Sequence, residues 1–256
     1  MDTGIVERKM QSKRIRVIKA VLFDLFDTIV LITEKEENYY PRCLRKLYDV
    51  LVENGVNVSF EEFSRVYFEV RNKLYAETSE NFEEPHFNVR VSLTLKKLGY
   101  EYDVSDRLVT KSSMAFAEEF IRYVALDNNA INVLNKLRRK YKLGLITNFA
   151  LSECVWKLLE KFDLKKFFSV IVISAEINRR KPSPEIFEKA LKALNVNASE
   201  AVFIGDTIGL DVKGAKNAGI KSVLIKRRPI KEMNIKPDRI INNLKELLVV
   251  LEEFKD

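Results

Sequence analysis

VIKAVLFDLFDTI, residues 17–29, is the stretch of sequence from which the fold can be inferred. Within it, the apolar run Val17–Phe23 ends at Asp24. A short run rich in Val, Ile and Leu is typical of a strand buried on both faces, as strands of parallel sheets are. Ligands of such sheets bind beyond the carboxyl ends of the strands. Asp24 therefore stands where a functional carboxylate is expected.

The pattern of apolar residues changes along the rest of the chain. From about Glu34 to Val124 they recur at helical spacing, which predicts helices at 37–54, 60–78, 83–99 and 104–123. After Asp127, predicted helices alternate with predicted strands at 143–146, 170–174, 201–204 and 222–225. The helices between and after these strands are predicted at 130–140, 152–162, 184–194, 210–218 and 245–254. Such alternation indicates a parallel sheet covered by helices on both faces.

We therefore predict an α/β fold in two parts. A Rossmann-like core with a parallel sheet comprises residues 14–31 and 126–256. A helical-bundle cap domain, residues 32–125, is inserted between the two pieces of the core.

The composition is that of a soluble globular protein. Of 256 residues, 46% are hydrophobic and 32% are charged. No run of about 18 apolar residues predicts a membrane span, and two cysteines far apart in the sequence fit a reducing cytoplasm. The net charge of +7 is spread along the chain, without a zinc-finger or aromatic-basic motif. We therefore expect a cytoplasmic protein that binds neither nucleic acid nor membranes.

Polar side chains follow four of the predicted strands at the points where these strands end. They are Asp24, Thr147 and Asn148, Lys181, and Asp206 with Asp211. Because the carboxyl ends of parallel strands meet at one edge of a sheet, we expect these groups to converge. Carboxylates, a lysine and a hydroxyl at one place predict a catalytic site.

Four segments of the chain resemble, in order, the four signature motifs of the haloacid dehalogenase superfamily. They are FDLFDTI (23–29), LITN (145–148), KPSPEIF (181–187) and GDTIGLD (205–211). The framework of the resemblance covers residues 17–225, and the predicted helical insert resembles that of the subgroup with a helical-bundle cap.

The resemblance implies roles for the strand-end residues. Asp24 would act as the nucleophile and form an aspartyl ester with the substrate. Thr147 and Lys181 would hold the anionic group that is transferred. Asn148 would either contact the substrate or shape its turn.

The same resemblance implies a Mg²⁺ site made of oxygen ligands. Asp24, Asp206 and the main-chain carbonyl of Phe26 would supply the protein ligands. Asp211 would bind the ion directly or through a water.

The first motif departs from the usual pattern of phosphatases in this superfamily. They read Asp-x-Asp, and the second Asp protonates the leaving oxygen; this chain has Phe26 there, and Asp27 stands where glycine is usual. General acid–base help is worth roughly 10²–10⁴-fold in rate. Haloacid dehalogenases carry an aromatic residue at this position, need no magnesium, and typically lack the first acid of the fourth motif. Phosphonate-cleaving members carry a small residue there and use a lysine from the cap.

The acids of the fourth motif decide between these possibilities. Two carboxylates beside Asp24 would raise the pKa of the nucleophile unless a cation were present. We therefore predict a Mg²⁺-dependent hydrolase, a phosphatase acting on a small anionic substrate. The alternatives are a 2-haloacid dehalogenase and a non-catalytic binding protein with a vestigial site. Asp27 either replaces the missing acid or simply fits its turn.

The cap is expected to choose the substrate. Five of its residues are candidates for the pocket, with core packing or solvent exposure as the alternative for each: Tyr39, Tyr40, Arg42, Phe87 and Arg90. The single histidine, His86, is expected to be exposed and is given no role. Trp156 lies in a predicted helix that flanks the sheet and is expected to pack rather than bind a ligand.

Overall fold

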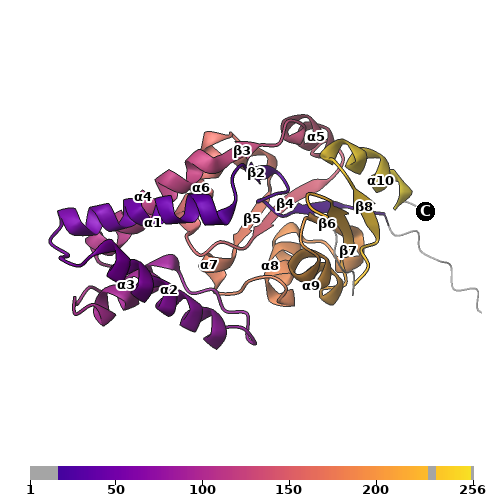
Figure 1. Ribbon diagram of the computed structural model, residues 1–256. Coiled ribbons are helices and arrows are strands. Elements are labelled where there is room, and N and C mark those ends of the chain that lie inside the picture. The colour runs from indigo at the N-terminus through magenta and orange to yellow at the C-terminus, as the bar shows by residue number, and fades with distance from the viewer. Residues whose placement is uncertain (1–16, 230–234, 255–256) are drawn as a thin grey trace, which may run out of the picture.

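A computed structural model describes residues 17–229 and 235–254 of the protein (Figure 1); residues 14–16 of the predicted core lie outside these ranges. Its centre is a six-stranded sheet in which every neighbouring pair of strands is parallel, in the order β5-β4-β1-β6-β7-β8. The strands are β1 (Ala20–Phe23), β4 (Lys142–Thr147), β5 (Val170–Ile173), β6 (Ala201–Gly205), β7 (Lys221–Ile225) and β8 (Arg239–Ile241). The predicted α/β fold class is confirmed.

The register of the central strands explains why polar residues meet at one edge of the sheet. Phe23, the last residue of β1, lies opposite Leu145 of β4 and Ile204 of β6. Asp24 therefore leaves the sheet between the ends of its two neighbours. The chain runs from β1 outward to β4 and β5 and then returns to the other side of β1 with β6. Such a switch point is where open α/β sheets bind ligands.

Helices cover both faces of the sheet, as Figure 1 shows. Side chains of β1 alternate between the faces: Val21 and Phe23 belong to one apolar cluster, and Ala20 and Leu22 to another. The first cluster is completed by α5 (Ala130–Leu137), α6 (Ser152–Lys161) and α10 (Leu247–Glu253). The second is completed by α8 (Pro184–Leu194) and α9 (Lys213–Asn217).

Four α-helices stand between β2 (Val30–Ile32) and β3 (Val124–Leu126) and extend away from the sheet (Figure 1). They are α1 (Glu36–Glu53), α2 (Phe60–Glu77), α3 (Phe87–Lys97) and α4 (Arg107–Phe120), here called the helical insertion. They begin and end within a few residues of the four predicted segments. An antiparallel pair, β2 with β3, leads into and out of it. The buried side chains of the helical insertion continue the apolar cluster that covers one face of the sheet. That the insertion is a separate domain stays a prediction.

The structure differs from the sequence-based prediction mainly in short elements. β2, β3 and β8 have three residues each, too few to show an alternating pattern. The helix predicted at 210–218 is α9 preceded by a π-helical turn, Ile208–Val212; such turns are frequent at functional sites. The remaining short helices are α7 (Ser174–Ile177) and the 3₁₀ turns Ile121–Tyr123, Lys165–Phe167, Ala198–Glu200 and Leu244–Glu246.

Both cysteines are free and buried, Cys43 in α1 and Cys154 in α6. Burial raises the pKa of the Cys43 thiol to about 12 and also raises the pKa of Cys154. Both are small residues of the apolar core. Within residues 17–229 and 235–254, no helix combines the length and apolar character needed to cross a membrane.

Candidate active site

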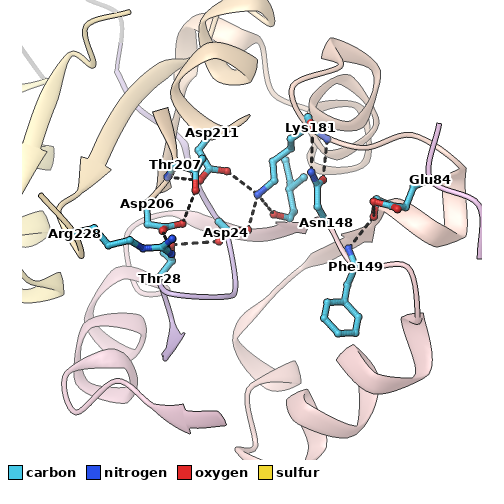
Figure 2. Close-up of polar contacts among 12 residues, drawn as sticks. Asp24, Thr28, Glu84, Asn148, Phe149, Lys181, Asp206, Thr207, Asp211 and Arg228 are labelled. Atoms are coloured by element: carbon cyan, nitrogen blue, oxygen red, sulfur yellow. Dashed lines mark hydrogen bonds and ion pairs between the residues drawn. The ribbon is translucent and has the colours of Figure 1, made fainter. Parts of the chain in front are cut away.

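Lys181 lies at the centre of the strand-end residues, and its ammonium joins two of their carboxylates. Its Nζ is 2.5 Å from Oδ1 of Asp24 and 2.7 Å from Oδ1 of Asp211, and it donates to the carbonyl of Ile146 at 3.2 Å. Figure 2 shows both carboxylates directed at this ammonium. Lys181 is only 2% exposed. Residues from four strand-end loops therefore meet in one buried polar cluster.

The electrostatics of this cluster are dominated by burial. Burial raises the pKa of Asp24 to about 7, although Lys181 opposes the shift. Burial and the charge of Asp211 raise the pKa of Asp206 to about 6. Burial also disfavours the charge of Lys181, but the carboxylates of Asp211 and Asp24 outweigh it and raise the Lys181 pKa. The cluster thus holds more negative charge than one lysine neutralises.

The acidic residues are arranged as a candidate cation site. Oxygens of Asp24, Asp206 and Asp211 all lie within 4.8 Å of one another. Asp206 accepts a hydrogen bond from Thr207 Oγ1 at 3.1 Å, and its other oxygen is 2.9 Å from Nη2 of Arg228. Three carboxylate oxygens around one point form a donor set of the kind that hard cations such as Mg²⁺ prefer. The role predicted for the Phe26 carbonyl stays a prediction.

The two polar residues at the end of β4 differ in their surroundings. Thr147 is fully buried, and its Oγ1 has no hydrogen-bond partner among the described residues. Buried hydroxyls are normally paired, so this oxygen is available to a bound group. Asn148 instead holds the backbone of Lys181: its Oδ1 accepts from the Lys181 N–H at 2.8 Å, and its Nδ2 donates to the Lys181 carbonyl at 3.0 Å. Its predicted contact with substrate stays a prediction.

Asp27 is tied into the turn that follows the first motif. Its φ of 52° lies in the left-handed region, which glycine adopts most easily. Its Oδ1 accepts from the N–H of Ile32 at 3.1 Å, and its Oδ2 is 2.5 Å from Nη2 of Arg228. These contacts engage both oxygens and favour the turn interpretation of Asp27 over a role as replacement acid.

The side chain of Phe26 packs in an aromatic cluster. Its ring stacks on Phe149, with centroids 4.9 Å apart, and lies 5.7 Å from the ring of Phe120 in α4. The residue that departs from the phosphatase pattern thus connects the first motif to the helical insertion.

Comparisons with known proteins identify the family of this chain. The haloacid dehalogenase-like hydrolase family matches residues 61–225. A glyceraldehyde 3-phosphate phosphatase of Methanopyrus kandleri is 31% identical over 246 residues, which are 93% of this chain and 99% of that protein. The chain belongs to the haloacid dehalogenase-like hydrolase family. The resemblance found in the four motifs is thereby confirmed, and the protein is a hydrolase by membership.

Other family members are similar over most of the chain. A glyceraldehyde 3-phosphate phosphatase of Pyrococcus abyssi is 33% identical, covering 82% of each chain. The crystal structure of a 2-haloacid dehalogenase from Pseudomonas syringae has a TM-score of 0.72 at 25% identity, covering 93% of this chain and all of that one. A haloacid dehalogenase-type phosphatase from Thermococcus onnurineus has a TM-score of 0.65 at 26% identity, covering 91% of this chain and 98% of that one.

A cavity of about 320 Å³ adjoins the polar cluster of this family member. Three of the five insertion residues proposed for the pocket line it: Tyr40, Phe87 and Arg90. The other two do not. Tyr39 packs instead against Phe120 and Tyr123. Arg42 is exposed and forms an ion pair with Glu34, which is the solvated alternative.

Several residues that line the cavity were not singled out from the sequence. They are Tyr75, Glu84, Phe116, Phe149, Ala150, Leu151, Arg180 and Leu210. Arg180 could have been found from the sequence, because it directly precedes Lys181, the first residue of the third motif. Glu84 had none, because it lies in the linker between α2 and α3, far in sequence from every motif.

The structure changes the expectation for His86 and bears out the one for Trp156. His86, expected to be exposed, is half-buried and caps α3: its Nδ1 accepts from the N–H of Asn88 at 3.2 Å, and its Nε2 is 3.0 Å from Glu153. A neutral imidazole can cap a helix in this way because one ring nitrogen is an acceptor. Trp156 lies in α6, packs against the apolar core cluster as expected, and also donates to Glu176 at 2.7 Å.

Proposed function

We propose that this protein is a Mg²⁺-dependent phosphatase of small phosphate esters, with Asp24 as its nucleophile. The observation that carries the proposal is the third carboxylate, Asp206, beside the buried Asp24, Lys181 and Asp211. The three acids outnumber the two cationic side chains beside them, the buried Lys181 and the exposed Arg228. This balance favours a bound cation, and a cation is what phosphoryl transfer uses to neutralise charge. The relatives named as phosphatases support the same reaction.

The residues of the cluster would supply the nucleophile and the phosphoryl-binding groups of a two-step transfer. The Asp24 carboxylate attacks the phosphorus of the ester, and the bond from phosphorus to the ester oxygen breaks. Lys181 and the unpartnered Thr147 hydroxyl hold the phosphoryl oxygens. Water then attacks the aspartyl-phosphate and releases phosphate, which restores Asp24. The proton that the water loses balances the proton that the departing alcohol gains.

The donor set fits the metal that this reaction uses. Asp24, Asp206 and the Phe26 carbonyl would hold Mg²⁺, with Asp211 direct or through a water. When bound, the ion neutralises the charge of the transferring phosphoryl group. A cation would also keep Asp24 ionised, although burial raises its pKa to about 7.

We further propose that residues 32–125 form a cap domain over this site. The support is the cavity, whose walls come partly from the helical insertion and partly from the loops of the core. The reacting group would then bind to the core, and the insertion would contact the alcohol part of the ester.

A haloacid dehalogenase is the second candidate. The similarity to a 2-haloacid dehalogenase structure and the aromatic Phe26 favour it. The acidic cluster argues against it, since a dehalogenase gains nothing from a cation beside its nucleophile. The relatives at 31% and 33% identity also carry phosphatase names.

One set of assays tests the proposal. The purified protein is given glyceraldehyde 3-phosphate, p-nitrophenyl phosphate or 2-chloropropionate, each with Mg²⁺ or with EDTA, and phosphate and chloride release are measured. We expect phosphate release that needs Mg²⁺, and Asp24→Asn should lower it at least ~10³-fold because it removes the nucleophile. Asp49→Asn, the same substitution at a partly exposed acid of α1, should have no effect.

Two outcomes would contradict this assignment. Chloride release in EDTA without any phosphate release would support the dehalogenase. Absence of turnover in all assays would support a binding protein with a vestigial site.

A further inference from the structure

The cavity begins next to the residues that would hold the phosphoryl group. Three of its lining residues adjoin site residues in the sequence: Asn148 follows Thr147, Arg180 precedes Lys181, and Leu210 precedes Asp211. Asn148 also hydrogen-bonds the backbone of Lys181 at 2.8 and 3.0 Å, so the cavity adjoins the polar cluster through this residue. An ester with its phosphorus at Asp24 would place its alcohol in this cavity.

Arg90 of α3 brings a buried positive charge to the cavity wall. Its Nη1 donates to the hydroxyls of Tyr40 and Tyr67 at 3.2 and 3.3 Å. Its Nε is buried without a partner, and no described residue accepts from its Nη2. No described carboxylate lies within 4.0 Å of the guanidinium. Buried arginines normally use their donors in ion pairs or hydrogen bonds, so this one retains donor capacity for a ligand.

Glu84 brings a buried acceptor to the same wall. It is 6% exposed and forms no ion pair with a described residue. Its Oε2 accepts from Ser174 Oγ at 3.5 Å, and the Ser174 Oγ in turn accepts from the N–H of Phe149 at 2.9 Å. Figure 2 shows the Glu84 carboxylate on the Asn148 and Phe149 side of the cluster. Burial raises the pKa of Glu84, partly offset by the charges of Arg180 and Arg90.

A donor and an acceptor on one wall fit a particular kind of alcohol. An apolar alcohol would leave the Nε donor of Arg90 and the second oxygen of Glu84 without partners in a buried place, which is unfavourable. An alcohol with its own carboxylate would meet the carboxylate of Glu84. An uncharged alcohol with hydroxyl or carbonyl oxygens can accept from Arg90 and donate to Glu84. The volume of about 320 Å³ is at the small end of ligand pockets.

We infer that Arg90 and Glu84 determine the specificity of this site and select small polyol or hydroxy-carbonyl phosphates. The inference rests on the proposed phosphatase function and adds which residues recognise the alcohol. The phosphoryl group is held by the core, and the hydroxyl groups by these two residues.

Two esters of nearly equal size test the inference. Glycerol 3-phosphate and 1-propyl phosphate have the same carbon chain and similarly poor leaving groups, and they differ in the two hydroxyls. We expect kcat/KM for glycerol 3-phosphate to exceed that for propyl phosphate at least ~10²-fold, because the analogue leaves buried polar groups unpaired. 3-Phosphoglycerate, which adds a carboxylate, should also be a poorer substrate than glycerol 3-phosphate.

Variants show whether the two residues cause this preference. Glu84→Gln keeps the shape but removes the charged acceptor, and Arg90→Lys keeps the charge but removes the planar fork. Each should lower the glycerol-to-propyl ratio about tenfold or more, because kcat/KM for glycerol 3-phosphate falls much further than kcat/KM for propyl phosphate. Merely structural damage would lower both activities together. Arg71→Lys is the matched control, because Arg71 lies over the ring of Tyr40 but does not line the cavity.

The outcomes separate the inference from the function on which it rests. If Mg²⁺-dependent hydrolysis occurs but the ratio is near one, or is unchanged in Glu84→Gln, the inference is wrong and the phosphatase stands. A preference for 3-phosphoglycerate would also overturn it. If no ester is hydrolysed, including p-nitrophenyl phosphate, both are wrong. Thermal unfolding shows whether Arg90→Lys and Glu84→Gln fold. If only Glu84→Gln folds, its glycerol-to-propyl ratio alone tests the inference, and a ratio equal to that of the wild type overturns it.

Discussion

At position 26 this chain carries an aromatic ring where phosphatases of its superfamily usually carry the acid that protonates the leaving oxygen. The ring stacks on Phe149 and lies close to Phe120 of the insertion. It therefore contributes packing energy where the usual residue contributes proton transfer. Esters whose leaving oxygen needs no proton should be the least affected by this exchange.

Replacing the ring with an acid should restore part of the missing proton transfer. We expect Phe26→Asp to raise kcat about ten- to a hundredfold for alkyl phosphates and to change p-nitrophenyl phosphate little, since general acid help is worth roughly 10²–10⁴-fold. The lost ring contacts should cost about 1–3 kcal/mol of stability. Phe26→Leu, which adds no acid, should accelerate neither ester. Equal acceleration of both esters by Phe26→Asp would count against proton transfer as the cause.

The site residues differ in how far the sequence could predict them. Asp24, Thr147, Lys181, Asp206 and Asp211 all follow strands, so strand prediction with four ordered motifs was enough to bring them together. Their distances and the hydrogen bonds of Asn148 to the Lys181 backbone depend on how loops pack. Glu84 could not be found, because what makes it notable is burial, which a linker sequence does not reveal.

Among the elements, the contact between α9 and α8 sets the position of the third motif. Gly214 of α9 packs so closely that an added Cβ would lie 2.5 Å from Cε2 of Phe187 and 3.1 Å from Cα of Pro182. Pro182 directly follows Lys181. A side chain at position 214 would therefore push on the segment that carries the lysine.

This close approach predicts the effect of Gly214→Ala. In an open helix Gly→Ala stabilises by roughly 0.5–1 kcal/mol, but here the clash should destabilise the protein by about 1–3 kcal/mol and lower kcat/KM. Gly209→Ala is the control, since nothing lies within 4 Å of its added Cβ. Chemical unfolding and phosphate release measure both effects. If the two variants unfold at the same denaturant concentration, the packing explanation fails.

Long elements were predicted well for a physical reason. The four insertion helices and the core strands repeat their apolar pattern over enough residues for the period to be recognised. The three-residue strands β2, β3 and β8 owe their structure to pairing with distant segments. No local pattern records such pairing.

For the molecule as a whole, the acidic cluster links stability to pH and metal. The folded-state pKa values of Asp24 and Asp206, about 7 and about 6, lie above the usual 3.8. Ionising these groups therefore costs the folded state more than the unfolded state. The loss of stability grows from about pH 4 and is complete above about pH 7.

Metal-free protein should accordingly have a lower Tm at pH 8 than at pH 5. Each kcal/mol lowers Tm by about 2–4 °C in a chain of this size, so we expect a decrease of several degrees. Mg²⁺ should raise Tm more at pH 8 than at pH 5, because it binds the ionised carboxylates. Asp206→Asn should remove most of this gain, as measured by calorimetry. A Tm that Mg²⁺ leaves unchanged at both pH values would place the metal site elsewhere.

The two buried thiols are natural probes of local opening in this protein. Only a thiolate reacts with alkylating reagents, and Cys43 and Cys154 are both buried with raised pKa values. Each can be modified only when the chain around it opens. One thiol lies in α1 and the other in α6, both belong to one apolar cluster, and the charge of Cys43 contributes to the raised pKa of Cys154. The masses of labelled peptides therefore report how often the packing between the insertion and the helix beside the sheet opens. Thiol labelling of the native protein thus measures local opening, as hydrogen exchange does, and it needs no introduced cysteine.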